Sequence, residues 1–328
     1  MNDNVQNVAM QEVAVREVAS KIRANIGRVL VGKEAAVELA LVALGCEGHL
    51  LFEDVPGVGK TMLARALAVS LGLSFSRIQC TPDLLPSDVT GMMVFNPKNA
   101  EFQLRSGPIM AQIVLVDEIN RATPRTQSSM LEAMGERQVT IDGRAYSLPQ
   151  PFLVLATENP VEFEGTFPLP EAELDRFLLR VSLGYPSATE EMQILTRLEG
   201  EHPIHTLGSV VTPEELRDFT ALRREVYMED SLRSYLVELV ARTRSHPDLE
   251  LGVSPRGTVA LFDTARMLAA LRGRNFVSPE DIKYLAPYVL AHRVKVGAEA
   301  AVRGVTATSV IAEIVAGTPV PTEAAFNE

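Results

Sequence analysis

The sequence predicts an α/β protein in which a parallel sheet lies between layers of helices, followed by a smaller, all-helical part. Up to about residue 185, short apolar runs alternate with helical ones, and the runs 113–116 and 152–156 are apolar at every position. Strands that are covered by helices on both faces have this uninterrupted apolar pattern. After Tyr185-Pro186 the strand signals fade and helix starts dominate.

Length and charge narrow the class of protein. The 328 residues are enough for one to three domains, and their 46% apolar and 22% charged content is typical of a globular protein. A net charge of -11 argues against a general nucleic-acid coat, because such proteins are usually basic. The start lacks a signal-peptide pattern, and the apolar runs are far shorter than the roughly 20 residues that cross a bilayer. With only Cys46 and Cys80 as cysteines, we expect no disulfide framework and a cytoplasmic location.

The first motif is a strand, a turn and a helix in LLFEDVPGVGKTMLARALAVSLG, residues 50–72. Residues 50–52 predict a buried strand, and the apolar spacing of 62–67 predicts one buried helix face. Gly72 stands where a helix C-cap is expected. A nucleotide loop needs this arrangement, in which a strand leads through a turn directly into a helix.

The turn ends in Gly59-Lys60-Thr61, the last three letters of the phosphate-loop pattern G-x-x-x-x-G-K-[ST]. Asp54 replaces the first glycine, but aspartate also adopts turn conformations, so no phosphate-contacting group is lost. Gly57 and Gly59 allow the backbone to approach phosphates closely. Lys60 can bridge the β and γ phosphates, and the Thr61 hydroxyl can ligate Mg²⁺. The alternative is an ordinary turn that contains Gly-Lys-Thr by chance.

A pair of acids follows the second apolar run. Asp117 and Glu118 come directly after 113–116, and adjacent strand residues point to opposite faces. They are therefore not an acid/base pair that meets across one substrate. We expect Asp117 to hold Mg²⁺ through water and Glu118 to orient the attacking water. The alternative is two solvated acids at a strand end.

Three further residues could complete the site. Asn159 follows the run 152–156, where a strand end would place its amide beside the attacking water. Around PEAELDRF, the apolar residues at 174–178 form a helical stripe that leaves Arg176 outside. An outward arginine is usually only solvated, but one that faces a neighbour's nucleotide would neutralise transition-state charge. Arg256, in GVSPRGTVAL, opens a helix from which a cation could reach phosphates.

The order of these motifs resembles the AAA+ ATPases, from about Val31-Gly32 to about residue 295. The detailed sequence of the motifs is similar to the MoxR family, which is related to the small ATPase subunit of magnesium chelatase. The blocks that carry this resemblance are EDVPGVGKT, VDEINRATPRTQSSMLEAMGERQVTIDG, LPQPFLVLATENP and EGTFPLPEAELDRF. In that family EDVPGVGKT is a familiar form of the loop, so Asp54 no longer argues against the motif.

The resemblance implies a role for each residue. Lys60 and Thr61 would form Walker A, and Asp117 and Glu118 Walker B, with Thr61 and Asp117 as the Mg²⁺ ligands. Catalysis would depend on Lys60, Glu118, sensor 1 (Asn159) and the arginine finger (Arg176), and sensor 2 would be Arg256. The implied cofactor-binding set is Val31, Gly32, Pro56, Gly57, Val58, Gly59, Lys60, Thr61, Met62 and Arg256.

The expected domains are an AAA+ core at 1–186 and a helical lid at 187–328 with a mobile tail. The resemblance places a β insertion at about 83–108 and a hairpin at about 136–149. The hairpin is also predicted by the alternation at 139–141 and by the Asp142-Gly143 turn. In a ring it would lie near the pore; the alternative is an ordinary surface hairpin.

By this resemblance the chain is a Mg²⁺-dependent ATPase that binds ATP and forms a ring, expected to be a hexamer. It would remodel or mature a client protein, by cofactor or metal insertion, with a separate von Willebrand A-type partner, because the chain has no D-x-S-x-S motif. No membrane insertion is expected.

Three alternatives stay open. A nucleic-acid motor would share every ATP residue but needs basic hairpins, and the acidic total makes nucleic acid a poor partner. An activator of alternative-sigma-factor transcription would carry a Gly-Ala-Phe-Thr-Gly-Ala loop, which EGTFPL matches poorly. A nucleotide-responsive binding subunit with little hydrolysis is the third, although Glu118 and Arg176 speak against it.

Overall fold

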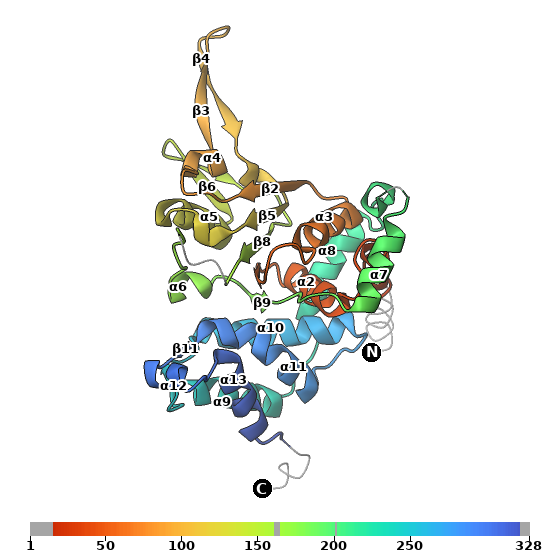
Figure 1. Ribbon diagram of the computed structural model, residues 1–328, viewed down its shortest axis with the longest axis vertical. Coiled ribbons are helices and arrows are strands. Elements are labelled where there is room, and N and C mark those ends of the chain that lie inside the picture. The colour runs from red at the N-terminus through yellow and green to blue at the C-terminus, as the bar shows by residue number, and fades with distance from the viewer. Residues whose placement is uncertain (1–15, 161–164, 201, 322–328) are drawn as a thin grey trace, which may run out of the picture. The chain divides into compact units, whose positions relative to one another are not determined.

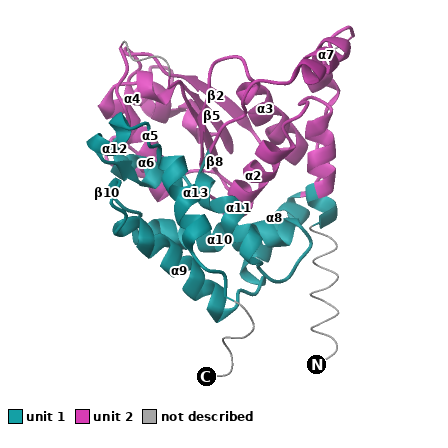
Figure 2. Cartoon of the chain, turned by 60° about the horizontal axis from the view of Figure 1, so that its bottom comes forward, with its two compact units in different colours: residues 1–19, 170–180, 213–328 teal, residues 20–169, 181–212 magenta. Residues whose placement is uncertain are grey.

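The computed structural model describes residues 16–160, 165–200 and 202–321. The chain divides into two compact units that interleave along the sequence (Figure 2). We call residues 20–169 and 181–212 the sheet unit, and residues 1–19, 170–180 and 213–328 the helical unit. The division into domains at residue 186 stays a prediction. Of the tail predicted to be mobile, residues 322–328 lie outside the described part.

The main sheet has the strand order β2-β5-β8-β1-β9, and each of its strands except β9 lies entirely in the sheet unit. The strands are β1 (Leu50–Glu53), β2 (Phe75–Gln79), β5 (Ile113–Asp117), β8 (Leu153–Glu158) and β9 (Leu179–Val181). The pairings of β2 with β5, β5 with β8 and β8 with β1 are parallel, which confirms the predicted parallel sheet. Residues 113–116 and 153–156 are fully buried, as strands between two helical layers should be.

Helices cover the sheet from two sides. In Figures 1 and 2, α2 (Glu34–Gly45) and α3 (Lys60–Leu71) lie to one side of the strands and α5 (Pro124–Glu136) to the other. The buried face of α3 includes Leu63 and Leu67. Gly72 ends α3 in the left-handed conformation, with a φ of 66°, as its position in the sequence predicts.

The remaining elements of the sheet unit are most of a helix at 16–27, further helical segments and two hairpins. Residues 16–19 of that helix belong to the helical unit. The further segments and the hairpin strands are α4 (Pro86–Thr90), β3 (Gly91–Asn96), β4 (Glu101–Ser106), η1 (Pro108–Met110), η2 (Ile119–Arg121), β6 (Gln138–Ile141), β7 (Arg144–Ser147), α7 (Ala188–Arg197) and η3 (Pro203–Thr206). The β3–β4 hairpin projects from the sheet (Figure 1). At its base a Cβ on Gly107 would collide with the Val89 carbonyl oxygen, so this close approach requires glycine. Asp142 and Gly143, with φ values of 48° and 75°, form the two-residue turn between β6 and β7.

The described residues of the helical unit form mainly helices and one short strand pair. Its elements are α6 (Glu171–Leu174), α8 (Pro213–Ala221), η4 (Leu222–Arg224), α9 (Asp230–Arg244), β10 (Leu249–Leu251), α10 (Pro255–Leu271), α11 (Pro279–Leu290), η5 (Ala291–Arg293), β11 (Lys295–Val296), α12 (Ala298–Val302) and α13 (Ala307–Gly317). β10 and β11 pair antiparallel, so the expectation of an all-helical part was incomplete. Strands this short are below what alternation can reveal. In the described part of the chain, no helix is both long enough and apolar enough to span a membrane.

Candidate functional site

The loop between β1 and α3 holds the predicted phosphate-binding residues. Gly57 and Gly59 have φ values of 87° and 103°, which L-residues with a side chain rarely adopt. Lys60 is the first residue of α3, and its ammonium donates to the carbonyl oxygens of Asp54 (2.8 Å) and Val55 (3.3 Å). Burial lowers the pKa of Lys60, and the nearby carboxylates oppose this shift. The Lys60 side chain therefore folds back onto the first residues of the loop that precedes it.

Asp54, the departure from the glycine pattern, anchors this loop. Its carboxylate is buried and accepts hydrogen bonds from the Ser182 hydroxyl (3.0 Å) and from the backbone amides of Leu183 and Gly184. Lys33 donates to the carbonyl oxygens of Leu183 (2.9 Å) and Gly184 (3.2 Å). Asp54 thus holds the 182–184 segment against the start of the loop, and Lys33 connects the same segment to the start of α2. No sequence pattern indicated this role, because residue 54 and segment 182–184 are far apart along the chain.

The two acids predicted from the strand end lie opposite the loop. Asp117 ends β5, and Glu118 follows it with a φ of 56°. The Thr157 hydroxyl donates to Asp117 Oδ1 (2.8 Å) and accepts from the Glu118 amide (2.8 Å). Thr157 was not predicted, although its place two residues before Asn159 at the end of a strand is a usable signal. It fixes the Asp117 carboxylate and the backbone of Glu118 relative to β8.

One polar cavity of about 320 Å³ brings most of the predicted residues together. Its lining residues are Pro56, Gly57, Gly59, Lys60, Thr61, Met62, Arg77, Gln79, Asp117, Glu118, Thr157 and Asn159. Asn159 follows β8 directly and is 7% exposed. Loop and acids converge here because β1, β8 and β5 are parallel neighbours whose carboxyl ends lie at the same edge of the sheet.

Two residues of β2 complete this cavity and were missed by sequence reasoning. Arg77 donates to Asp117 Oδ2 through Nε (3.0 Å) and Nη2 (2.6 Å), and also to Gln79 (2.8 Å). Gln79 in turn donates to Glu118 (3.1 Å). Only the strand order could have indicated them, since β2 pairs with β5 and Gln79 lies beside Asp117. Through these bonds β2 holds both acids.

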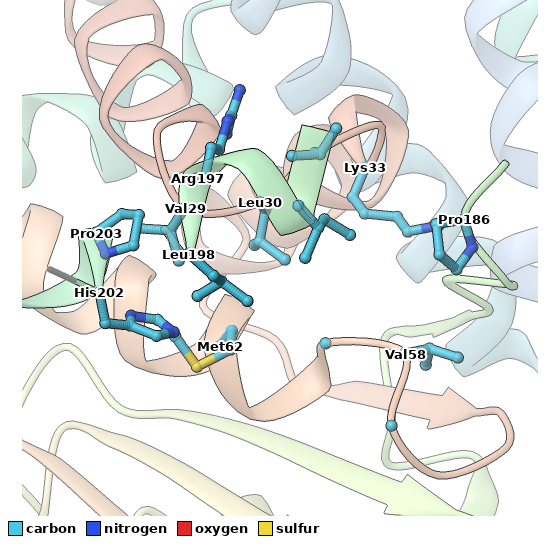
Figure 3. A pocket seen from close by; sticks show the side chains of 14 residues that line it. Val29, Leu30, Lys33, Val58, Met62, Pro186, Arg197, Leu198, His202 and Pro203 are labelled. Carbon is cyan, nitrogen blue, oxygen red and sulfur yellow. The ribbon is translucent and has the colours of Figure 1, made fainter. Parts of the chain in front are cut away.

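A second, mainly apolar cavity of about 200 Å³ adjoins the first and shares Gly57, Gly59 and Met62 with it. Its other lining residues are Val29, Leu30, Val31, Lys33, Val58, Pro186, Ile194, Arg197, Leu198, His202 and Pro203. Figure 3 shows Met62, Leu198 and His202 gathered from three separate segments. Val31 and Val58 were predicted, whereas Gly32 is not a lining residue. The contributions of α7 and η3 were not predicted.

Arg176 and Arg256 both belong to the helical unit. Neither lines the two cavities, whose lining residues all belong to the sheet unit. The predicted helix around Arg176 is shorter than expected: α6 ends at Leu174, and Arg176 lies beyond it. Arg256 is the second residue of α10, whose N-cap is Ser254.

The polar cavity has a donor set that suits Mg²⁺ bound together with phosphates. The described residues contain no cluster of three or more histidine, cysteine, aspartate or glutamate side chains that could hold a metal ion. Mg²⁺ commonly binds through one or two carboxylates and substrate phosphates rather than in an all-protein cage. The Thr61 hydroxyl and the Asp117 carboxylate lie in the same cavity as Lys60 and fit that mode.

Comparison with known proteins identifies the family. Residues 49–179 match the model of the ATPase family associated with various cellular activities (AAA), and residues 241–314 match the AAA lid domain. The chain is 53% identical over 302 residues to the uncharacterized protein YeaC of Bacillus subtilis, covering 91% of this chain and 93% of that protein. It is 42% identical over 277 residues to Chaperone MoxR1 of Mycobacterium tuberculosis, covering 82% of this chain and 73% of that protein.

A solved structure agrees with this relationship. The crystal structure of an ATPase candidate from Cytophaga hutchinsonii has a TM-score of 0.91 and 34% identity, and the match covers 97% of this chain and 99% of that one. The fold, the two matched family regions and the MoxR relative agree. The chain therefore belongs to the MoxR family of AAA+ proteins, and it is a nucleotide-binding ATPase.

Proposed function

We propose that ATP spans the two adjoining cavities, with its base in the apolar cavity and its phosphates in the polar one. The observation that supports this is that the two cavities adjoin and share three lining residues, Gly57, Gly59 and Met62. On one side of these residues the cavity is mainly apolar, and on the other side the cavity is lined by Lys60. Apolar surface with few polar groups suits a base, and loop amides with a lysine suit phosphates. Val31 and Val58 would contact the base side.

Hydrolysis would then use the residues around the polar cavity. Lys60 would leave the carbonyl oxygens of Asp54 and Val55 and bind the β and γ phosphates. Thr61 and Asp117 would hold Mg²⁺, Asp117 through water, and the ion when bound neutralises charge on the phosphates. Glu118 would orient the attacking water as general base, with Asn159 beside it.

The direct test is phosphate release by the purified protein with and without Mg²⁺. We expect Mg²⁺-dependent turnover in the wild type and at least a roughly 10²-fold loss in Lys60→Ala, because catalysis of phosphate transfer depends mostly on positioning and on electrostatic stabilisation of the transferring group. Arg65→Gln, an exposed change on α3 away from the lining, is the matched control. Equal turnover by wild type and Lys60→Ala would overturn the assignment.

We further propose that the chain acts as a ring, expected to be a hexamer, in which Arg176 reaches the nucleotide of the neighbouring subunit. The ring would remodel a client protein as a chaperone, with a von Willebrand A-type partner. The name of the relative Chaperone MoxR1 supports the chaperone interpretation. The test is capture of partners from cell lysate by the ATP-trapped Glu118→Gln form. A von Willebrand A-type protein would support this proposal, and nuclease-sensitive nucleic acid would favour a nucleic-acid motor instead.

A further inference from the structure

A buried arginine holds the backbone on both sides of Arg176. The side chain of Arg293, in η5, is 2% exposed. It donates to Asp175 Oδ1 (2.7 Å), to the Phe177 carbonyl oxygen (2.6 Å) and to the Leu178 carbonyl oxygen (3.2 Å). These acceptors lie on either side of Arg176 in the chain, so one rigid guanidinium fork fixes the backbone at that point.

The same carboxylate connects this segment to α10. Asp175 Oδ2 accepts from the Ser254 hydroxyl (2.9 Å), and that hydroxyl also accepts from the Arg256 amide (3.2 Å). Ser254 is the N-cap of α10, so Asp175 links the Arg176 segment to the first turn that carries Arg256. All of these residues belong to the helical unit.

The buried guanidinium of Arg293 lies within the electrostatic reach of a second arginine, Arg256. Burial lowers the pKa of Arg293, bonding to Asp175 opposes this shift, and the charge of Arg256 adds to it. Holding a buried guanidinium near a second arginine is costly, and a simple packing contact would not need it. The bonds that offset this cost fall on the residues on either side of Arg176.

We propose that Arg293 and Asp175 are positioning residues that fix Arg176 and the N-terminus of α10 as one body. This rests on the proposed role of Arg176 at a neighbour's nucleotide. The helical unit then carries both arginines, so a movement of this unit shifts the pair together. A change in how the helical unit contacts the nucleotide of its own subunit would thereby alter the position of Arg176 at the nucleotide of the neighbouring subunit.

The test uses mixed rings, because a misplaced Arg176 can be replaced by a neighbour. Lysine cannot reproduce the guanidinium fork, and displacement of a catalytic group by about 1 Å can cost about 10²-fold. We therefore expect Arg293→Lys to lose at least about 10-fold in kcat, with ATP affinity changed less than about twofold. Mixing it with Lys60→Ala subunits, which retain Arg176, should restore turnover. Mixing it with Arg176→Ala subunits should not.

Two controls separate the possible failures. If Arg176→Ala is not restored by Lys60→Ala, the proposed action on a neighbour is wrong and this inference falls with it. If that pair is restored but Arg293→Lys is not, only the positioning role is overturned. Arg274→Lys weakens another buried ion pair of the helical unit, to Asp281, without touching 170–180. If Arg274→Lys shows the same pattern of loss and restoration, the effect comes from a general destabilisation of the helical unit, and the proposal is overturned.

A milder pair of variants covers the case in which Arg293→Lys does not fold. Threonine and glycine are about equal as N-caps, but only threonine has a hydroxyl that can donate to Asp175. Ser254→Gly should therefore have at least about threefold lower kcat than Ser254→Thr, and Lys60→Ala subunits should restore it. Equal kcat values would overturn the link between Asp175 and α10.

Discussion

Replacing Asp54 with glycine would give the loop the complete phosphate-loop pattern, yet we expect it to damage the protein. The buried Asp54 carboxylate accepts hydrogen bonds from Ser182, Leu183 and Gly184. Glycine removes all three and leaves the buried Leu183 amide without its acceptor. A hydrogen bond to a charged group contributes about 1.5–3 kcal/mol net, and an orphaned buried donor costs about 1–3 kcal/mol. The bonds are not additive, so we expect a loss of about 3 kcal/mol in the free energy of unfolding.

Thermal and chemical unfolding measure this loss. For a unit of this size about 3 kcal/mol corresponds to a Tm decrease of roughly 6–12 °C. Asp54→Asn keeps one acceptor oxygen and should fall between glycine and the wild type. The Lys60 ammonium bonds to the backbone oxygen of residue 54, which glycine retains, so ATP binding below the transition should survive. A Tm within about 1 °C of the wild type, or above it, would refute the anchoring role.

Two further predictions concern the sheet unit. The imidazole of His49 donates to the Met134 carbonyl oxygen through Nε2 and accepts from the Val154 amide through Nδ1, so it is held neutral, and burial lowers its pKa to about 4. Between about pH 6.5 and 4 the unfolded chain therefore binds a proton at His49 that the folded chain does not bind, and the free energy of unfolding should fall by about 3 kcal/mol as the pH decreases through that window. Urea unfolding at each pH measures this loss. A loss of the same size in His49→Gln would show that His49 is not its source. Arg77 occupies an Asp117 oxygen in the polar cavity, so Arg77→Gln should lower several-fold the Mg²⁺ concentration that supports half-maximal binding of a fluorescent ATP analogue, with Arg65→Gln unchanged. An unchanged or higher Mg²⁺ requirement in Arg77→Gln would show that this arginine does not compete for the acid.

The sequence predicted features that depend on local pattern. The all-apolar runs at 113–116 and 152–156 indicated the buried parallel strands, and Asp142-Gly143 indicated the hairpin turn. The loop, the two acids and Asn159 could be predicted to converge because each lies at, or directly after, the carboxyl end of a strand. In each case the signal lies in the same short stretch of chain as the feature that it indicates.

What the sequence could not reveal depends on partners that are distant along the chain. Arg77 and Gln79 reach the acids only because β2 lies beside β5, and no short pattern determines the strand order. Asp54 accepts hydrogen bonds from 182–184, and Arg293 donates to Asp175, in both cases across a large separation in sequence. Such contacts are set by the tertiary fold, and the short β10–β11 pair depends on it in the same way.

Comparing ATP binding with turnover in Glu118→Gln is the sharpest check on the proposed catalytic arrangement. Glutamine keeps the size and polarity of the side chain but cannot accept the proton of the attacking water. Fluorescent-nucleotide titration should give an affinity within a few-fold of the wild type, while single-turnover phosphate release should fall at least roughly 10²-fold. Near-normal turnover with intact binding would contradict the assignment of Glu118, and with it the catalytic arrangement proposed for this cavity.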